Sequence, residues 1–423
     1  MKRRKNMETY NKITLIISLI FVLGLVACNS SPPPASTSEV LEETTSLEEI
    51  ELVIWSAEHG MYLKEQFEIE HPNVTVIIEN QGWDQVLHQN LLNAIQAGTA
   101  PDIVIGESYF QQLAEAGYLL PVDEAIADIK DDIIPGTYKG AEYNGALYGV
   151  PAFTGVFVFE RNCKVITSAG LDCDTPPHSW SKLLEHAQTI TEKGDGDYYG
   201  YSLQGPVGPL TGGLLRIAVF LAQTDASLCR NDCTEPYFNN PKALPVMTFL
   251  RQLNQYTPPG LTANPEEGQV YVALFHGQSA YQIAGSWHPD WAKREDCEDC
   301  RYSAVPIPQD GHPASIIVGN VIYAALKETK HPDVALEFIK LVVREDMQEQ
   351  VYPKLGRLPA TRSALTKLRL DIDPATQTFI DELLNNPDLR ILPQWRKNPQ
   401  KIWRIYNEML EQVLSTNRPG FRV

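Results

Sequence analysis

The sequence predicts an α/β protein with two domains and a mainly parallel sheet covered by helices on both faces. Between residues 51 and 117, short β-branched segments alternate with longer segments of helical periodicity, an order typical of strands joined by helices. About 370 residues follow residue 50 of the 423-residue chain. One hydrophobic core rarely serves a chain of that length, so two domains are expected.

The first half of the pattern predicts three strands and three helices. Residues 74–78 are mostly β-branched and are expected to form a strand. Residues 83–97 place apolar side chains on one helical face, and Gly98 ends that helix. Ligands of such sheets bind beyond the carboxyl ends of the strands, which here carry residues 55–60 and 106–108. The other strands are expected at residues 52–55 and 103–105, and the other helices at 61–69 and 110–116.

The remainder of the chain continues the mixture of strands and helices, without a visible internal repeat. Asp195 and Asp197 suggest a calcium site, but the run lacks the further oxygen ligands that calcium takes, which favours a turn at 193–197. A glycine-rich stretch covers residues 205–213. Helices are expected at residues 180–191, 241–256, 332–344 and 399–414, and strands at 156–159 and 316–326.

The N-terminus has the pattern of an export signal. Basic residues 2–5 precede an apolar run at 13–27, which is shorter than the ~20 residues that a bilayer span needs. Small residues before Cys28 resemble the bacterial lipoprotein signal, which implies that residues 1–27 are removed and that Cys28 is acylated. The alternative is an ordinary signal peptide or a short anchor helix. Residues 28–50 are rich in Ser, Thr, Pro and Glu and are expected to be a disordered tether.

Charge and composition exclude several kinds of partner. Residues 1–27 carry five basic side chains and Glu8, a net charge of +4, so the chain's −18 becomes −22 without them. Nucleic acid and anionic lipid both need clustered Lys and Arg, so neither is an expected electrostatic partner. No later apolar run reaches spanning length. The body is therefore expected outside the cytoplasm, lipid-anchored to the cell membrane through Cys28 (on the periplasmic face where the cell has two membranes).

The other cysteines agree with an oxidising compartment. They fall in three close pairs, for which local disulfides are the economical interpretation. The pairs are Cys163 with Cys173, Cys229 with Cys233, and Cys297 with Cys300. A zinc ion held by the last four of these residues is the alternative, because two short-spaced pairs are a metal-site pattern. Neither a cofactor nor another metal is expected.

Several segments, none of them specific alone, resemble one family by their order along the chain. Residues 176–184 resemble its Pro-x-Thr-Trp-Asp-Glu-Leu element, with Ser-Lys in place of Asp-Glu. Residues 366–423 match poorly. The family is that of the large bacterial extracellular solute-binding proteins, the carbohydrate-type substrate-binding lipoproteins of ABC importers. The other matching segments are 101–123 (from Pro-Asp-Ile-Val-Ile to Leu-Pro-Val-Asp), 143–151 (Tyr-Asn-Gly-Ala-Leu-Tyr-Gly-Val-Pro), 280–287 (ending Gly-Ser-Trp), 330–339 (Lys-His-Pro-Asp-Val-Ala-Leu-Glu-Phe-Ile) and 356–362 (Gly-Arg-Leu-Pro-Ala-Thr-Arg).

The resemblance implies a two-lobe periplasmic-binding-protein-like fold. Each lobe would be a mainly parallel sheet flanked by helices, and the lobes would close on a ligand in the cleft between them by a hinge motion. The chain would cross between lobes near residues 151–155, 306–318 and 362–370. The expected segments are 51–153 in lobe 1, 154–312 in lobe 2, 313–365 returning to lobe 1, and C-terminal helices, mostly in lobe 2, at 366–423.

Aromatic residues are candidates for stacking on a sugar, because sugars present apolar C–H faces. Trp55 and Trp83 lie near the strand ends of the first lobe, and Phe153 lies at the first crossing. The resemblance implies that Trp287 and Trp395 occupy positions where the family brings in stacking rings. Core packing is the alternative for each tryptophan, and it weighs most for Trp55 and Trp83.

Polar residues must hold the hydroxyl rim of a sugar. Carboxylates and amides accept hydrogen bonds from vicinal hydroxyls, and arginine donates as a fork. Glu58 and Glu107 have the alternative of being solvated loop charges. The polar candidates are Glu58, Glu107, Ser108, Asn320 and Arg357.

The expected function is capture of a sugar or oligosaccharide and its delivery to the permease subunits of an ABC importer, by a monomer without enzymatic activity. One alternative is a binder of another solute, such as a peptide or polyamine, and another is a ligand sensor for a membrane receptor. A third is an extracellular enzyme acting on glycosides. The chain lacks the usual hydrolase, metalloprotease and nucleotide-binding motifs, but a glycosidase needs only two carboxylates.

Overall fold

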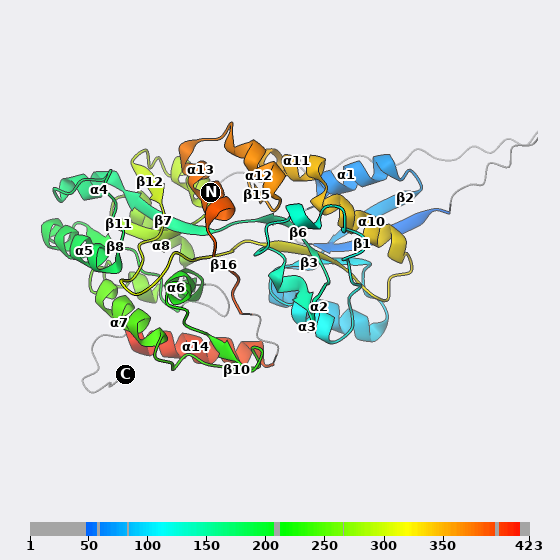
Figure 1. Ribbon diagram of the computed structural model, residues 1–423, viewed down its shortest axis with the longest axis horizontal. Coiled ribbons are helices and arrows are strands. Elements are labelled where there is room, and N and C mark those ends of the chain that lie inside the picture. Colours follow the sequence, from blue (N-terminus) through cyan, green and yellow to red (C-terminus); the bar gives the residue numbers. More distant parts are fainter. Residues whose placement is uncertain are drawn as a thin grey trace, which may run out of the picture. The chain divides into compact units, whose positions relative to one another are not determined.

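The structure is a computed structural model that describes residues 48–56, 60–82, 84–206, 212–264, 266–393 and 397–414 (Figure 1). The chain from Glu48 onward forms one compact unit. The predictions for the export signal, for Cys28 and for most of the tether lie outside the described residues, as do those for Glu58, Trp83 and Trp395.

The first sheet combines a parallel half with strands that return from later in the chain. Its strand order is β15-β6-β14-β3-β1-β2. β1 pairs in parallel with β2 and β3, whereas β14 is antiparallel to both β3 and β6. The strands are β1 (Ile50–Ser56), β2 (Val74–Asn80), β3 (Ile103–Gly106), β6 (Val150–Thr154), β14 (Val321–Ala325) and β15 (Leu358–Pro359).

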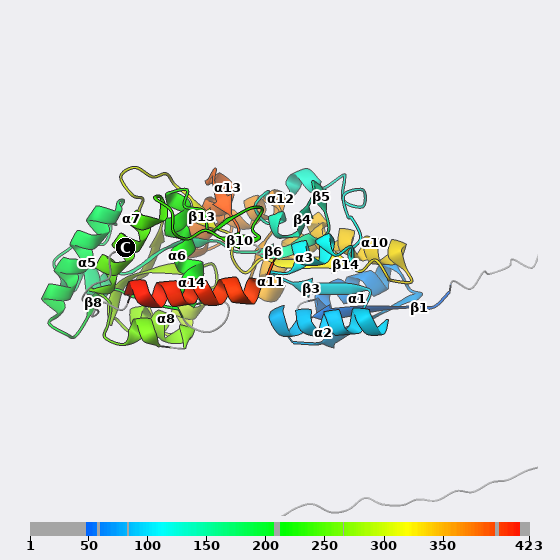
Figure 2. The ribbon, with the colours of Figure 1, turned by 90° about the horizontal axis from the view of Figure 1, so that it is seen from below.

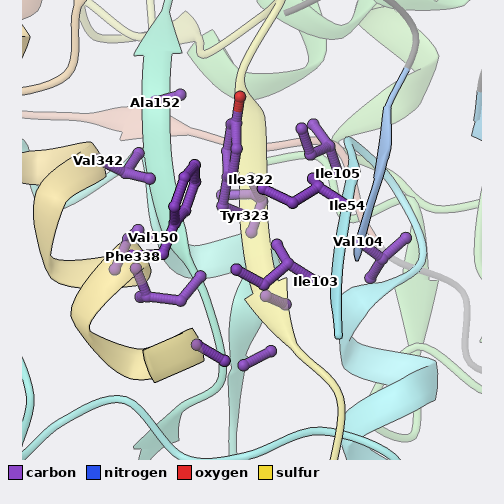
Figure 3. Packing of buried hydrophobic residues seen from close by; sticks show 14 of the residues in the cluster. Ile54, Ile103, Val104, Ile105, Val150, Ala152, Ile322, Tyr323, Phe338 and Val342 are labelled. Atoms are coloured by element: carbon purple, nitrogen blue, oxygen red, sulfur yellow. The ribbon is translucent and has the colours of Figure 1, made fainter. Parts of the chain in front are cut away.

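Helices connect and cover this sheet. The connections within the parallel half are α1 (Met61–Glu70) and α2 (Asp84–Ala97), and α3 (Phe110–Glu115) follows β3. α10 (Pro332–Val343) packs on β6 and β14, and Figure 3 shows Phe338 and Val342 of this helix facing those strands. Leu87 and Leu91 of α2 are buried in the same core, as their helical spacing predicts.

The second sheet has the order β12-β7-β11-β8. β7 is antiparallel to both β11 and β12, and only β8 runs parallel to β11. The strands are β7 (Phe157–Asn162), β8 (Tyr199–Tyr201), β11 (Ser279–Gly285) and β12 (Cys300–Ser303). Figure 1 shows them grouped with α4, α5, α6 and α8.

Local signals explain the helices around the second sheet. α5 begins after Ser179, whose hydroxyl accepts from the backbone N–H of Lys182, and it ends at Asp195 in the left-handed conformation, within the expected turn. α14 packs against α7 (Figure 2). The helices are α4 (Cys163–Ser168), α5 (Trp180–Gly194), α6 (Gly212–Gln223), α7 (Ala243–Asn254), α8 (Glu267–Phe275), α9 (His288–Arg294) and α14 (Pro399–Leu414).

Two details of the predicted sheets are wrong. The mainly parallel arrangement holds for β1, β2 and β3 and for the pair of β8 with β11. β14 and β7 pair antiparallel, because they arrive directly from the other sheet rather than through the helical crossover that parallel pairing requires. The strand expected at 316–326 is divided into β13 (Ser315–Ile316) and β14. Gly319 lies between them with a φ of 59° and turns the chain, and β13 pairs with β16 (Leu389–Arg390) instead.

A third hydrophobic cluster joins the two sheets where the chain passes between them. β7 begins just after β6, and Val156 between them forms a bridge with Ile317, which precedes β14. Leu358 of β15 and Phe379 of α13 are buried in this cluster. The remaining elements are α11 (Glu345–Leu355), α12 (Arg362–Arg369), α13 (Pro374–Asn385), the short strands β4 (Glu142–Tyr143), β5 (Ala146–Leu147), β9 (Cys229–Arg230) and β10 (Glu235–Pro236), and the 3₁₀ turns η1 (Lys130–Asp132), η2 (Lys139–Ala141) and η3 (Leu261–Ala263).

Three disulfides join cysteines that are close in the sequence. They are Cys163–Cys173, Cys229–Cys233 and Cys297–Cys300, the local pairs that the spacing favours. The zinc alternative for the last four cysteines is therefore wrong, because their sulfur atoms are bonded to one another. No helix in the described ranges is long and apolar enough to cross a membrane.

Candidate functional site

Register in the first sheet brings sequence-predicted polar residues to one edge. Ile322 of β14 lies opposite Gly106, the last residue of β3, and the two strands are antiparallel. Asn320, just before β14, and Glu107 and Ser108, just after β3, therefore stand at the same end of neighbouring strands. All three are half-buried. This is the edge at which α/β sheets bind ligands.

β15 brings Arg357 to the same edge. Leu358 pairs with Thr154, the last residue of β6, so Arg357 lies just beyond that strand end. Burial lowers the pKa of the Arg357 guanidinium, and the carboxylates of Glu107 and Asp290 act in the opposite direction. The site therefore holds a partly desolvated cation near two anions.

Asp290 is a site residue that sequence reasoning missed. It lies in the first turn of α9, which connects β11 to β12 of the second sheet. Its Oδ2 lies 3.3 Å from the position that a Cβ atom on Gly356 would take. Gly356 has a φ of 62°, which favours glycine, and it precedes Arg357. An acidic residue three positions after Trp287 was the available signal.

The side-chain amide of Asn320 is hydrogen-bonded to the described protein through its nitrogen atom and not through its oxygen atom. Its Nδ2 donates to the backbone carbonyl of Thr137. Its Oδ1 is buried and has no hydrogen-bond partner among the described residues. Buried polar atoms are usually paired, so this oxygen is an acceptor ready for a ligand hydroxyl.

Trp287 approaches this edge from the second sheet. It is half-buried, and its ring lies on Gly285: a Cβ atom there would come within 2.4 Å of its Cη2. A Cβ atom on Gly319 would lie 3.7 Å from the Cζ3 of the same ring, so the indole is next to the residue before Asn320. Trp287 and Asn320 are both predicted site residues and lie 33 positions apart in the sequence, and the fold thus brings them close in space.

Trp55 and Phe153 lie inside the first core. Trp55 is 8% exposed, and its indole Nε1 donates to the Glu79 carboxylate on β2 at 2.8 Å. Phe153 is 2% exposed. The placement of Trp55 fits core packing, the alternative that the sequence left open. The roles of Glu58, Trp83 and Trp395 stay predictions.

A buried polar cluster behind Trp287 was also missed by sequence reasoning. Glu160 of β7, Gln282 of β11 and His288 of α9 are each 0% exposed. The Glu160 carboxylate accepts from His288 Nδ1 at 2.7 Å and from Gln282 Nε2 at 2.6 Å. The available signal was a glutamate directly after the apolar run at 156–159, because a charge in a buried strand needs a partner.

Arg216 of α6 is a second buried charge in this region. Its Nε donates to the backbone carbonyl of Ile283 at 3.3 Å, and its other nitrogens donate to Gln204 and to the Tyr271 hydroxyl. The guanidinium carbon lies 4.5 Å from the centroid of the Tyr271 ring. Arg216 therefore connects α6 to β11 and to α8 by hydrogen bonds.

One group of side chains in the described part of the chain has metal-ligand geometry. Ligand atoms of Asp225, His312 and Asp388 lie within 4.8 Å of one another. Arg390 donates to both carboxylates, at 2.7 Å to Asp225 and at 2.5 Å to Asp388, and its hydrogen bonds lower the pKa of each. The guanidinium supplies the positive charge there, so the group forms an ion-pair network.

The arrangement can hold an uncharged polar solute. Trp287 offers an aromatic face, Asn320 an acceptor, and Arg357 a fork of donors, all at the ends of strands from two sheets. Aromatic faces with a few convergent polar groups are typical of binding sites for small molecules.

Known proteins of this architecture are similar over most of their length. A putative binding protein of Brucella abortus (strain 2308) is 25% identical over 385 residues, covering 88% of this chain and 89% of that protein. The cyclic alpha-maltosyl-1,6-maltose binding protein of Arthrobacter globiformis has a TM-score of 0.73 at 21% identity, covering 87% of this chain and 94% of that one. UgpB of Mycobacterium tuberculosis, in complex with glycerophosphocholine, has a TM-score of 0.70 at 20% identity, covering 87% and 93%.

These likenesses confirm the two-lobe α/β fold that the sequence predicted. Residues 59–349, more than half of the chain, match the family of bacterial extracellular solute-binding proteins. The order of segments that resembled this family and the two sheets agree with that match. The chain belongs to the bacterial extracellular solute-binding proteins.

Proposed function

We propose that this protein captures a sugar or oligosaccharide outside the cytoplasm and delivers it to the permease subunits of an ABC importer. The observation that carries the proposal is the half-buried ring of Trp287, which lies on Gly285 and next to Gly319, beside Asn320. A flat ring stacks on the apolar C–H face of a sugar, and the buried Asn320 oxygen accepts from a hydroxyl. The likeness to a cyclic maltosyl-maltose binding protein supports this class of solute.

Capture would proceed by closure of the two lobes on the solute. The segments 51–153 and 313–365 would form lobe 1, and 154–312 with most of 366–423 would form lobe 2. The passage between β6 and β7, with the Val156–Ile317 bridge, supports a hinge there. A ligand that contacts both lobes binds the closed state better and so shifts the population toward it.

Anchoring would place the protein where an importer can receive the solute. Acylation of Cys28 would hold the chain at the membrane, and residues 28–50 would be the tether. Each buried methylene of an acyl chain contributes ~0.8 kcal/mol. The bound protein would act as a monomer and would bind without turnover, so glycosides incubated with it remain intact.

A thermal-shift screen of the purified protein tests the proposal. A solute that binds only the folded state at ~100 times its Kd stabilises by ~2.7 kcal/mol. The panel comprises malto-oligosaccharides, other di- and trisaccharides, peptides and polyamines. A shift with a saccharide that disappears in Trp287→Ala and persists in Trp403→Ala, a matched change on α14, is expected. A shift with peptides or polyamines alone would overturn the sugar assignment.

A phosphodiester solute is the second candidate. Arg357 supplies a fork of donors that fits phosphate oxygens, and the UgpB structure holds glycerophosphocholine. Glycerophosphocholine therefore belongs in the panel. A shift with it that is lost in Arg357→Gln, without a shift for any saccharide, would favour this candidate.

A further inference from the structure

The Glu160 carboxylate is tied to both sides of the segment that carries Trp287. Gln282 donates to its Oε2 from β11 at 2.6 Å, and His288 donates to the same oxygen from Nδ1 at 2.7 Å. Gln282 stands five residues before Trp287, and His288 follows directly after it. One oxygen atom on β7 therefore fixes both the strand that enters this turn and the helix that leaves it.

Burial of these three polar side chains destabilises the folded state unless they are hydrogen-bonded to one another. All three side chains are 0% exposed. A carboxylate removed from water is strongly destabilising unless hydrogen bonds replace its hydration. Apolar side chains of similar volume would fill the space without that cost, so the polar cluster points to a role in fixing geometry.

Aromatic rings enclose the His288 imidazole and restrict its rotation. Tyr271 meets it edge to face with ring centroids 4.4 Å apart, and Phe275 does so at 5.9 Å. Arg216 in turn covers the face of Tyr271. The Nδ1–H of His288 thus stays directed at Glu160, and the backbone of its neighbour stays in place.

Trp287 depends on this anchoring because of its own position. It is the residue before α9 and makes no side-chain capping hydrogen bond. Its ring meets Phe157 edge to face at 6.2 Å and rests on the backbone of Gly285. A small rotation of the turn would carry the whole indole away from Gly319.

We propose that Glu160, acting through Gln282 and His288, is the positioning residue that holds Trp287 at the angle required for stacking on the solute. This inference rests on the proposed function, in which the Trp287 ring contacts the sugar. Glu160 itself touches no solute, since it is completely buried.

Fluorine NMR of the full chain labelled with 5-fluorotryptophan tests the positioning without any solute. The chain has seven tryptophans, and the Trp287 signal is the one that is lost in Trp287→Phe. His288→Leu is expected to shift or broaden this signal while leaving that of Trp180, which is buried in the same lobe, unchanged. His288→Asn keeps a donor near the Nδ1 position and should restore the native signal.

The matched control is His276→Leu, which removes a surface histidine that is paired with Glu295 at 3.0 Å. It should leave the Trp287 signal in place. Gln282→Met removes the other hydrogen bond to Glu160, and it replaces His288→Leu in the test if that variant does not fold. An unmoved Trp287 signal in both variants, or equal movement of the Trp180 signal, would overturn the positioning role.

Affinity for maltotriose provides the second measurement. His288→Leu should weaken binding about tenfold, because it displaces the Trp287 ring, and His276→Leu should leave the affinity unchanged. Equal affinity in His288→Leu and in the wild-type chain would contradict the inference while leaving the sugar site intact. Absence of saccharide binding in the wild-type chain would instead contradict the proposed function, and the fluorine spectra would still decide the positioning.

Discussion

Gly155 and Ser286 approach each other so closely that no side chain fits between them. A Cβ atom on Gly155 would come within 2.3 Å of the Ser286 hydroxyl oxygen and within 2.8 Å of the Val318 carbonyl. Val318 also donates its backbone N–H to the Gly155 carbonyl at 3.0 Å. The passage from β6 to β7 is therefore packed directly against the end of β11 and against the segment before β14.

Substitution of Gly155 is expected to destabilise the protein. Gly155→Ala forces these backbone segments apart, and such overpacking costs about 1–3 kcal/mol. Urea denaturation measures the change. Gly268→Ala is the matched control, because a Cβ atom on Gly268 meets nothing within 4 Å and the residue lies in α8. The control should be neutral or slightly stabilising, and equal losses in both variants would refute the close-packing argument.

Substitutions of Trp55 and Trp287 should have different effects, the first mainly on stability and the second mainly on saccharide binding. Trp55→Ala removes a ring that is buried on β1, so the free energy of unfolding should fall by about 3–5 kcal/mol. Trp287→Ala removes a half-buried ring, so it should abolish saccharide binding with a smaller loss of stability. Trp55→Phe is the control that keeps an aromatic ring in the core and removes the hydrogen bond to Glu79, so it should cost less than Trp55→Ala. Unchanged affinity in Trp287→Ala would remove the stacking claim.

The Glu70–Arg344 pair should contribute a pH-dependent part of the stability. Arg344 donates to both Glu70 oxygens, at 2.8 and 2.7 Å, and lowers the pKa of Glu70 from 4.5 to about 2. The carboxylate therefore stabilises the folded state fully above pH 4.5, and this contribution is lost as the pH falls toward 2. The pair is partly exposed, so its worth is about 1 kcal/mol or less.

Comparison of wild type with Glu70→Gln across this pH range measures the effect. The difference in unfolding free energy should be constant near neutral pH and shrink below pH 4.5. Glu408→Gln removes a looser helical pair with Arg404, at 3.6 Å, and should change little. A Glu70→Gln difference that grows on acidification would contradict the assignment.

The disulfides should stabilise according to the length of chain they close. Joint replacement of Cys163 and Cys173 by serine opens a link between residues ten positions apart and should cost about 2–3 kcal/mol. The Cys229–Cys233 pair spans four positions, so its removal should cost less. Guanidinium denaturation of both variants ranks them. The reverse order would show that native packing rather than loop length decides.

Much of the fold could be predicted because its signals are local. Residues 399–414 form the expected helix without a change of boundary, and α1, α2 and α10 differ from expectation by one residue at most. The expected strand at 316–326 fails at Gly319, where one left-handed residue lets the two halves join different sheets. Sequence patterns report the propensity of a segment, and they do not report which sheet it will enter.

The candidate site could be predicted in part for the same reason. Glu107, Asn320 and Arg357 follow or precede strands, and strand ends can be recognised in the sequence. Asp290 escaped notice because, apart from its position three residues after Trp287, its local pattern is that of a solvated helix residue. Trp55 has a strand-end position as well, yet its pairing register places it opposite Glu79 and inside the core.

The sequence by itself determined the helices and strands, the cysteine pairs and the family, because periodicity, capping residues and short spacings act over a few residues. Only the tertiary structure decided that Glu160 meets Gln282 and His288, which lie 122 and 128 positions further along the chain. Such contacts depend on strand register and on the path of the chain between two sheets. A shift of one residue in that register would turn Glu160 to the other face of its strand and separate all three side chains.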